Sequence, residues 1–167
     1  MANQWHGFIY MNGAYTSYDY PGGKRTELVA VNNSGTIVGQ VLFPKLSSYA
    51  QKLFTLNGSG STLIPLPSGT YYGALAVAMN NNGTIVGNLY TSNPDYFTGF
   101  VYTPSIGIVP FTTVGAQTSP TGINDDEVIV GTILTNALES FPFWTCTPQA
   151  ICTLDAQPAK GAPRKMN

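Results

Sequence analysis

The sequence predicts an all-β fold built from repeated units, and three observations carry this prediction. One octapeptide occurs three times at near-even spacing: NNSGTIVG at 32–39, NNNGTIVG at 80–87 and the more divergent NDDEVIVG at 124–131. Short runs of aromatic and β-branched residues alternate with Gly, Pro, Asn and Ser, and helical periodicity is missing almost everywhere. Four phenylalanines recur with a matching period, at Phe8, Phe54, Phe100 and Phe143. Two independent markers with one period indicate a true internal repeat.

The units follow one order of strands and turns. The first strand of the chain is followed by Asn12-Gly13, a strong hairpin signal, and the second ends at Pro21. The octapeptide then supplies the turn between the third and fourth strands. The second and third units repeat this order, and the fourth supplies two strands. The predicted strands are 7–10, 15–20, 28–32, 36–43, 52–56, 62–66, 75–80, 84–90, 99–103, 108–112, 121–124, 128–134, 142–146 and 150–155.

Four short strands in about forty residues are the strand number and length of a β-propeller blade. In the strand 84–90, Ile85 and Leu89 face one side while Val86 and Tyr90 face the other. A strand that is apolar on both sides is covered on both sides, as in stacked blades. We therefore expect an all-β, β-propeller-like fold with four-stranded antiparallel blades and about three and a half repeats. The β-trefoil is the alternative, because it has a similar strand number per repeat.

The repeated turns have a stereochemical basis. Asn tolerates positive φ and bonds its own backbone, and Gly takes the left-handed conformation freely. The glycine inside each fourth strand allows a neighbouring sheet or backbone to approach closely. Glu127 stands where the other turns have Gly, so that turn either changes type or carries strain of about 1 kcal/mol. The structural repeat residues are Asn32, Gly35, Gly39, Asn80, Gly83, Gly87, Asn124 and Gly131.

The chain is expected to form one repeat domain at 1–155, with units at 6–43, 52–90, 98–134 and 141–155, followed by a flexible tail at 156–167. An incomplete fourth unit requires an explanation, because propellers close with four to eight blades. We expect a homodimer in which two chains close a seven-bladed ring. A small monomeric ring or open clam, or a part of a longer propeller, are the alternatives.

The repeated motifs resemble those of the HAF repeat family. This likeness covers residues 6–155. It rests on His6-Gly7-Phe8-Ile9-Tyr10, on Val31 with the octapeptide after it, and on the segments 99–102 and 123–125. Only the first unit keeps the motif's histidine. The resemblance implies a bacterial, extracellular repeat protein, and it implies neither an activity nor catalytic residues.

Composition excludes several function classes. Charged residues make up 9% of the chain and the net charge is −1, so no electrostatic footprint for nucleic acid is visible. No apolar run is long enough to span a bilayer, and no signal peptide is visible. A chain rich in Tyr, Thr, Ser, Asn and Gly and poor in Lys and Glu favours an extracellular or cell-surface location.

The chemistry-bearing residues predict no enzyme, metal site or cofactor. His6 is the only histidine, and we interpret it as a strand residue beside the repeated Gly-Phe. The cluster Asp125-Asp126-Glu127 lacks the spacing of a calcium loop and reads as an acidic turn. Cys146 and Cys152 flank the last hairpin loop, where a disulfide and two free thiols are equally compatible with the spacing.

Aromatic residues are the best functional indication. Exposed rings in loops or near strand ends stack on sugars, although rings between blades serve packing alone. We expect a non-enzymatic binding or interaction module whose ligand is a glycan or a protein. The alternative is a self-assembling structural protein with no small ligand. The candidate ligand-binding residues are Trp5, Tyr49, Tyr71, Tyr72 and Tyr96.

Overall fold

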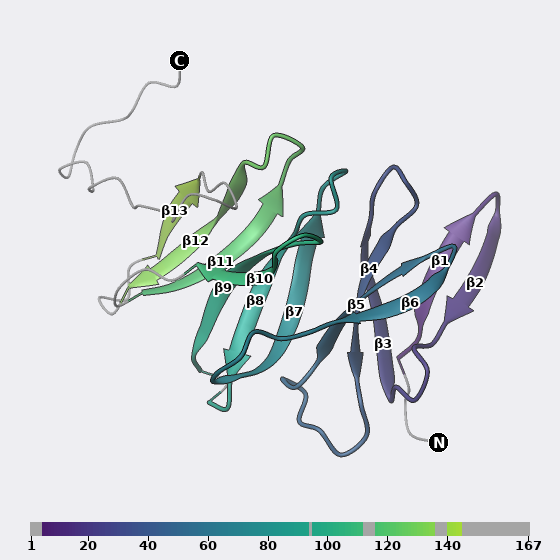
Figure 1. The fold of residues 1–167 in the computed structure, drawn as a ribbon, viewed down its shortest axis with the longest axis horizontal. Coiled ribbons are helices and arrows are strands. Elements are labelled where there is room, and N and C mark those ends of the chain that lie inside the picture. Colours follow the sequence, from purple (N-terminus) through teal and green to yellow (C-terminus); the bar gives the residue numbers. More distant parts are fainter. Residues whose placement is uncertain (1–4, 94, 112–115, 136–139, 145–167) are drawn as a thin grey trace.

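The computed structural model describes residues 5–93, 95–111, 116–135 and 140–144. Within these residues the regular elements are β-strands in four antiparallel sheets, which lie one behind another as an open stack (Figure 1). The β1–β2 hairpin lies at one end of the stack and β13 at the other. The predicted strand 150–155, the tail 156–167 and both cysteines, Cys146 and Cys152, lie outside the described residues.

The sheets are built from thirteen strands in the described residues. The first sheet contains β1 (Gly7–Met11) and β2 (Ala14–Tyr18). The second contains β3 (Arg25–Val31), β4 (Ile37–Leu42), β5 (Lys52–Asn57) and β6 (Gly60–Ile64), in this order. The third contains β7 (Tyr71–Met79), β8 (Ile85–Thr91), β9 (Phe97–Thr103) and β10 (Gly107–Phe111). The fourth contains β11 (Ala116–Ile123), β12 (Ile129–Thr135) and β13 (Ser140–Trp144).

The sheets are offset by half a unit from the sequence units. Each full sheet joins the last two strands of one sequence unit to the first two strands of the next, as in β3-β4-β5-β6. The chain passes to the next sheet in the middle of a unit, between β6 and β7 or between β2 and β3. The sheets therefore recur with the same spacing as the sequence repeat. Their boundaries lie in the middle of the sequence units, because strands of neighbouring units pair with each other.

The first strand of each later sheet carries a β-bulge. The register shifts between Leu28 and Ala30 in β3, between Ala76 and Ala78 in β7, and between Pro120 and Gly122 in β11. A bulge inserts one residue and breaks the alternation of faces. The broken alternation hid the first part of β7 and of β11 from the sequence prediction. β7 begins four residues before the predicted start at 75, and β11 begins five residues before the predicted start at 121.

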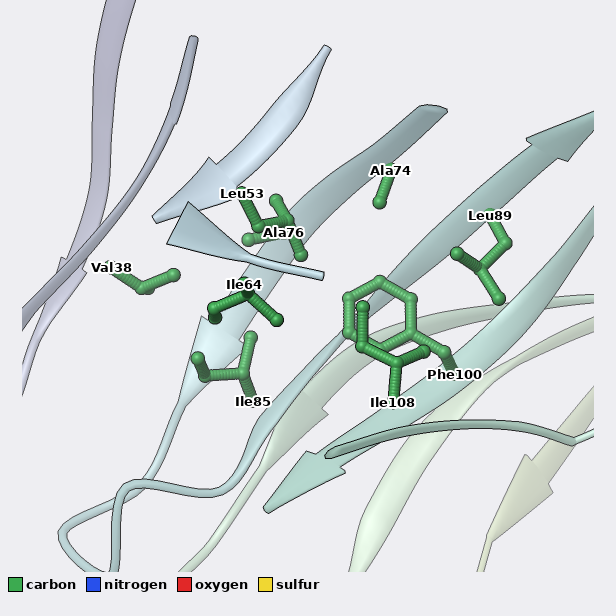
Figure 2. Packing of buried hydrophobic residues seen from close by; sticks show 9 residues of the cluster. All are labelled: Val38, Leu53, Ile64, Ala74, Ala76, Ile85, Leu89, Phe100 and Ile108. Atoms are coloured by element: carbon green, nitrogen blue, oxygen red, sulfur yellow. The ribbon is translucent and has the colours of Figure 1, made fainter. Parts of the chain in front are cut away.

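Two hydrophobic clusters fill the spaces between the sheets. The larger cluster joins residues of the second and third sheets, among them Leu53, Ile85, Leu89 and Phe100 (Figure 2). The smaller cluster joins the third and fourth sheets and includes Val86. The prediction that Ile85 and Leu89 face one side of β8 and Val86 the other is confirmed, because β8 is covered on both faces.

The recurrent phenylalanines cover the recurrent glycines. Phe54 and Phe100 are fully buried, and they pair in register with Gly39 and Gly87. A Cβ at Gly39 would lie 2.4 Å from the Phe54 ring and 2.7 Å from the Glu27 carbonyl oxygen. The close approach predicted at these glycines therefore comes from a ring on the paired strand and from the bulged strand's backbone. The register also places Phe143 opposite Gly131.

The three octapeptide turns have one geometry. In each, the first Asn accepts a hydrogen bond at its side-chain oxygen from the backbone N–H four residues later, over 3.0, 2.9 and 2.8 Å for Asn32, Asn80 and Asn124. The fourth residue has positive φ in every copy: 77° at Gly35, 80° at Gly83 and 62° at Glu127. The third turn thus keeps its type, and Glu127 takes the strained conformation.

A buried amide joins the second and third sheets, and its counterpart shows how the repeats diverge. Gln40 accepts a hydrogen bond from the Ala76 backbone N–H over 3.1 Å. Asn88 is the equivalent residue one repeat later, and Pro120 stands at the position equivalent to Ala76. Because proline carries no N–H, that bond cannot form, and the buried Asn88 Oδ1 has no partner among the described residues.

Candidate functional site

Three aromatic rings lie in consecutive contact at one end of the third sheet. The ring centres of Tyr49 and Tyr90 are 5.7 Å apart, and those of Tyr90 and Phe97 are 5.9 Å apart. Tyr90 and Phe97 are paired in register, near the end of β8 and at the start of β9. Tyr49 comes from the loop between β4 and β5. We call these three residues the aromatic row.

The loop that carries Tyr49 is fixed by a close backbone contact. The Ala74 N–H donates to the Gln51 carbonyl oxygen over 2.9 Å, and a Cβ at Gly73 would lie 1.9 Å from the Tyr49 carbonyl oxygen. Only glycine allows β7 and the loop to approach in this way. The second sheet therefore delivers Tyr49 to the end of the third sheet.

Further tyrosines flank the aromatic row. Tyr71 and Tyr72 open β7, and Tyr71 pairs with Thr91, next to Tyr90. Tyr96 directly precedes Phe97 and is 61% exposed, while Tyr49 and Tyr72 are 43% and 40% exposed. Four of the five predicted ligand-binding residues thus lie around the same end of one sheet.

Two ionisable groups at this end, Lys52 and Tyr90, have shifted pKa values. The Lys52 ammonium donates to the Tyr72 carbonyl oxygen over 3.1 Å, and partial burial lowers the pKa of this lysine. Burial, and after it the neighbouring Tyr49, raises the pKa of Tyr90. The Tyr90 hydroxyl therefore stays protonated, so that it is able to donate a hydrogen bond. Sequence reasoning missed Lys52 and Tyr90, because their contacts depend on how closely the loop from the preceding sheet approaches β7.

Trp5, the fifth predicted residue, belongs to a different set of contacts. The Arg25 guanidinium carbon lies 4.1 Å from the centre of the Trp5 ring, within the range of a cation–π interaction. Arg25 also donates to Glu27, and Glu27 accepts a hydrogen bond from Gln40. Trp5 is 58% exposed, but the contact of its ring with Arg25 connects it to β3.

The remaining candidate groups serve contacts within the fold. His6 Nδ1 lies 2.7 Å from Asp19 Oδ1, and both side chains are about half exposed. Asp125 accepts hydrogen bonds from the backbone N–H and side-chain amide of Asn81, and these bonds lower the pKa of its carboxyl group. In the part of the chain that the structure describes, no three His, Cys, Asp or Glu residues are grouped as metal ligands. The described residues contain no helix that is long and apolar enough to cross a membrane.

No family model and no curated protein matches the sequence. Among solved structures, the chain is similar to the β-propeller domain of the Trilobed protease from Pyrococcus furiosus, described as having an open velcro topology. The TM-score is 0.55 at 17% sequence identity, and the match covers 82% of this chain and 39% of that one.

The chain has a β-propeller-like fold. The predicted all-β architecture with four-stranded antiparallel sheets is confirmed, and the stack of separate sheets replaces the β-trefoil alternative. The propeller-like sheets do not close into a ring within the described residues (Figure 1). This chain spans about two fifths of the similar structure.

Proposed function

We propose that this propeller-like chain is a non-enzymatic binding module that takes a carbohydrate on the aromatic row. The observation that carries the proposal is the consecutive contact of Tyr49, Tyr90 and Phe97, with the exposed Tyr72 and Tyr96 beside them. Tyrosine rings offer flat apolar faces to the C–H groups of a sugar, and their hydroxyls bond to sugar hydroxyls. A row of rings suits an extended oligosaccharide better than a single small molecule.

Two of the described carboxylates are engaged in contacts within the fold, which supports binding rather than catalysis. Hydrolysis of a glycosidic bond needs two carboxylates that face the same bond. Here Glu27 is held by Arg25 and Gln40, and Asp125 is held by Asn81. These carboxylates are committed to the fold, whereas the aromatic row presents rings and hydroxyls.

The experiment is a glycan-array screen of the purified chain, followed by calorimetric titration of the best oligosaccharide. We expect Tyr49→Ala and Tyr96→Ala each to weaken binding about tenfold, the effect of losing one stacking contact. Tyr49→Phe keeps the ring and should bind nearly as the parent does. Ile106→Ala is the matched control, because Ile106 is 56% exposed in the turn between β9 and β10, away from the start of β9. Unchanged binding by Tyr49→Ala would contradict the proposal.

We further propose that the chain belongs to the HAF repeat family and acts outside the cell. The support is the repeated Gly-Phe strand and the octapeptide turn, which the structure shows to be the packing and turn units of the fold. Fractionation of cells that express the natural gene provides the test. Recovery of the protein only from the cytoplasm would contradict the extracellular assignment.

A further inference from the structure

The sheets inside the stack are joined by a chain of hydrogen bonds between successive octapeptide turns. The Asn33 backbone N–H donates to Asn81 Oδ1 over 2.8 Å, and the Asn81 backbone N–H donates to Asp125 Oδ1 over 2.9 Å. The second and third turns thus each accept a hydrogen bond from the turn before them. Among the described residues, the Asn33 side chain receives no such bond, and the Asp125 N–H has no acceptor. The series ends with an unused acceptor on one side and an unused donor on the other.

Within the residues that the structure describes, the first sheet lacks the two strands that the other sheets place before their equivalent of β1. β5, β9 and β13 pair with β4, β8 and β12, whereas β1 pairs only with β2 among the described strands. Phe8 occupies the position of the fully buried Phe54 and Phe100, yet it is 63% exposed, because no glycine-bearing strand lies beside it.

The second sheet is uncovered where those two strands are missing. Val31, at the end of β3, is 64% exposed. Ile37 is half-buried, whereas the equivalent Ile85 and Ile129 are fully buried against the preceding sheets. The gap beside β1 therefore has two consequences: β1 has no strand pair at its outer edge, and the face of the second sheet around Val31 and Ile37 is not covered by a preceding sheet.

The fourth sheet has the complementary defect. Val130 is 47% exposed, although Val38 and Val86 at the equivalent positions are fully buried against the next sheet. Leu134 is 40% exposed, while its equivalent Leu42 is 8% exposed. The β11–β12 pair therefore presents the face that elsewhere in the stack covers the first two strands of the following sheet.

We propose that a second copy of the chain supplies the missing strands, with β11–β12 of one copy beside β1 of the other and β12 paired to β1. Gly131 of β12 then lies under Phe8, Val130 covers the region of Ile37, and the Asp125 N–H reaches Asn33 Oδ1. One docking satisfies the open edge, the exposed faces and the unused hydrogen-bonding groups. This inference concerns self-association and does not depend on the proposed carbohydrate binding.

In this arrangement β1 of the second copy takes the place of β13 at the edge of β12. β13 pairs with β12 in the described structure, and its central residue is Pro142, which carries no N–H for a ladder. β1 has a full set of N–H groups and brings β2 with it. Because each copy contributes the same strands to the other, the contact closes with twofold symmetry, the commonest arrangement of oligomers. It produces two composite sheets in addition to the two complete sheets of each chain, so the ring contains six blades rather than the seven expected from strand number.

The test is light scattering of the purified chain and of two surface variants. The parent chain is expected to be a dimer. Phe8→Glu removes the β1 side of the contact, and Val130→Glu removes the β12 side, so each variant alone should be a monomer. An equimolar mixture of the two keeps one intact contact, in which β1 of the Val130→Glu chain binds β12 of the Phe8→Glu chain. The mixture should therefore contain a heterodimer. Ile106→Glu, an equally exposed change outside the contact, should leave the parent dimer intact.

Several results would overturn the proposal. A monomeric parent chain would show that a second copy does not fill the gap. Persistence of the dimer in Phe8→Glu, or failure of the mixture to associate, would show that β1 and β12 are not the paired surfaces. Hydrogen exchange of the parent chain tests the same contact without any variant, because pairing should protect the β1 amides as protein concentration rises. Fast exchange of these amides in the dimer would likewise reject the proposed pairing.

Discussion

Glu127 shows at the scale of one residue how a repeat tolerates divergence. It has φ of 62° where the other turns have Gly35 and Gly83, and its carboxylate accepts a long hydrogen bond of 3.3 Å from Thr84. The left-handed conformation costs a non-glycine residue about 1 to 2 kcal/mol. The turn is therefore maintained by its other hydrogen bonds and by the neighbouring turn.

Replacing Glu127 by Gly should stabilise the chain. We expect a gain of about 0.5 to 1 kcal/mol in the free energy of unfolding, since the relief of strain exceeds the added entropy of the unfolded glycine. Urea unfolding followed by circular dichroism measures this change. Gly83→Ala is the converse variant and should destabilise by about 1 kcal/mol. A stabilising Gly83→Ala would show that the left-handed turn is not required.

Asp125 makes the stability of the stack depend on pH. Its carboxylate accepts hydrogen bonds from the Asn81 backbone and side chain, and these lower its pKa in the folded state. A depressed pKa stabilises the folded chain above the unfolded pKa of about 3.9, and this contribution is lost as pH falls through the folded pKa. Stability should therefore decrease below about pH 4 through this group.

Asp125→Asn isolates that contribution. The amide oxygen still accepts a hydrogen bond from Asn81, as the Asn81 amide does from Asn33, but it does not titrate. We expect the urea midpoint of the variant to fall less steeply below pH 4 than that of the parent chain. Parallel pH curves for the two proteins would rule out a role for the Asp125 carboxylate.

At the scale of the element, the centre of β8 depends on the absence of a side chain at Gly87. A Cβ there would lie 2.0 Å from the Leu75 carbonyl oxygen and 2.7 Å from the Phe100 ring. The carbonyl belongs to the backbone of β7 and cannot turn away. Close packing at this position therefore fixes both the strand pairing and the ring.

Gly87→Ala should destabilise the chain by about 3 kcal/mol or more, because overpacking forces the paired strand and the buried ring to move. Gly58→Ala is the control, since nothing lies within 4 Å of a Cβ at Gly58, and its effect should stay within about 0.5 kcal/mol. Urea unfolding of both variants provides the comparison. Equal midpoints would show that β7 and Phe100 adjust freely.

Strand pattern alone predicted the elements that alternate cleanly and failed at the bulged ones. β8 was predicted with both faces covered, because its residues are apolar on both sides. The early parts of β7 and β11 were missed, since bulges near Ala76 and Pro120 break the alternation. The exposed Tyr49 and Tyr96 were predicted as candidate ligand-binding residues from their place in loops. The contact of Tyr49 with Tyr90 was not predictable, because it depends on the close approach of the Tyr49 loop to the backbone of β7 at Gly73.

At the scale of the whole molecule, stability should fall from the middle of the stack to its first sheet. β8 is covered by hydrophobic clusters on both faces, whereas much of the β1–β2 hairpin is exposed. In repeat stacks, stability is a sum of terms within and between neighbouring units. Native-state hydrogen exchange at low protein concentration should show slow exchange of the β8 amides and fast exchange of the β1 and β2 amides. Equal protection of the hairpin and β8 would indicate that the stack unfolds as one unit.

The sequence by itself determined the repeat, its period, the turn residues and the apolar faces of the central strands, because these features rest on local stereochemistry and on the alternation of side chains. Tertiary structure decided which strands share a sheet, since β4 and β5 pair across the boundary between sequence units. It also decided that Phe8 is exposed while Phe54 and Phe100 are buried, although all three stand at one position of the repeat. The burial of a side chain depends on which strands and sheets lie beside its own strand. Equivalent residues of a repeat are therefore buried to the same extent only where their neighbouring strands are equivalent too.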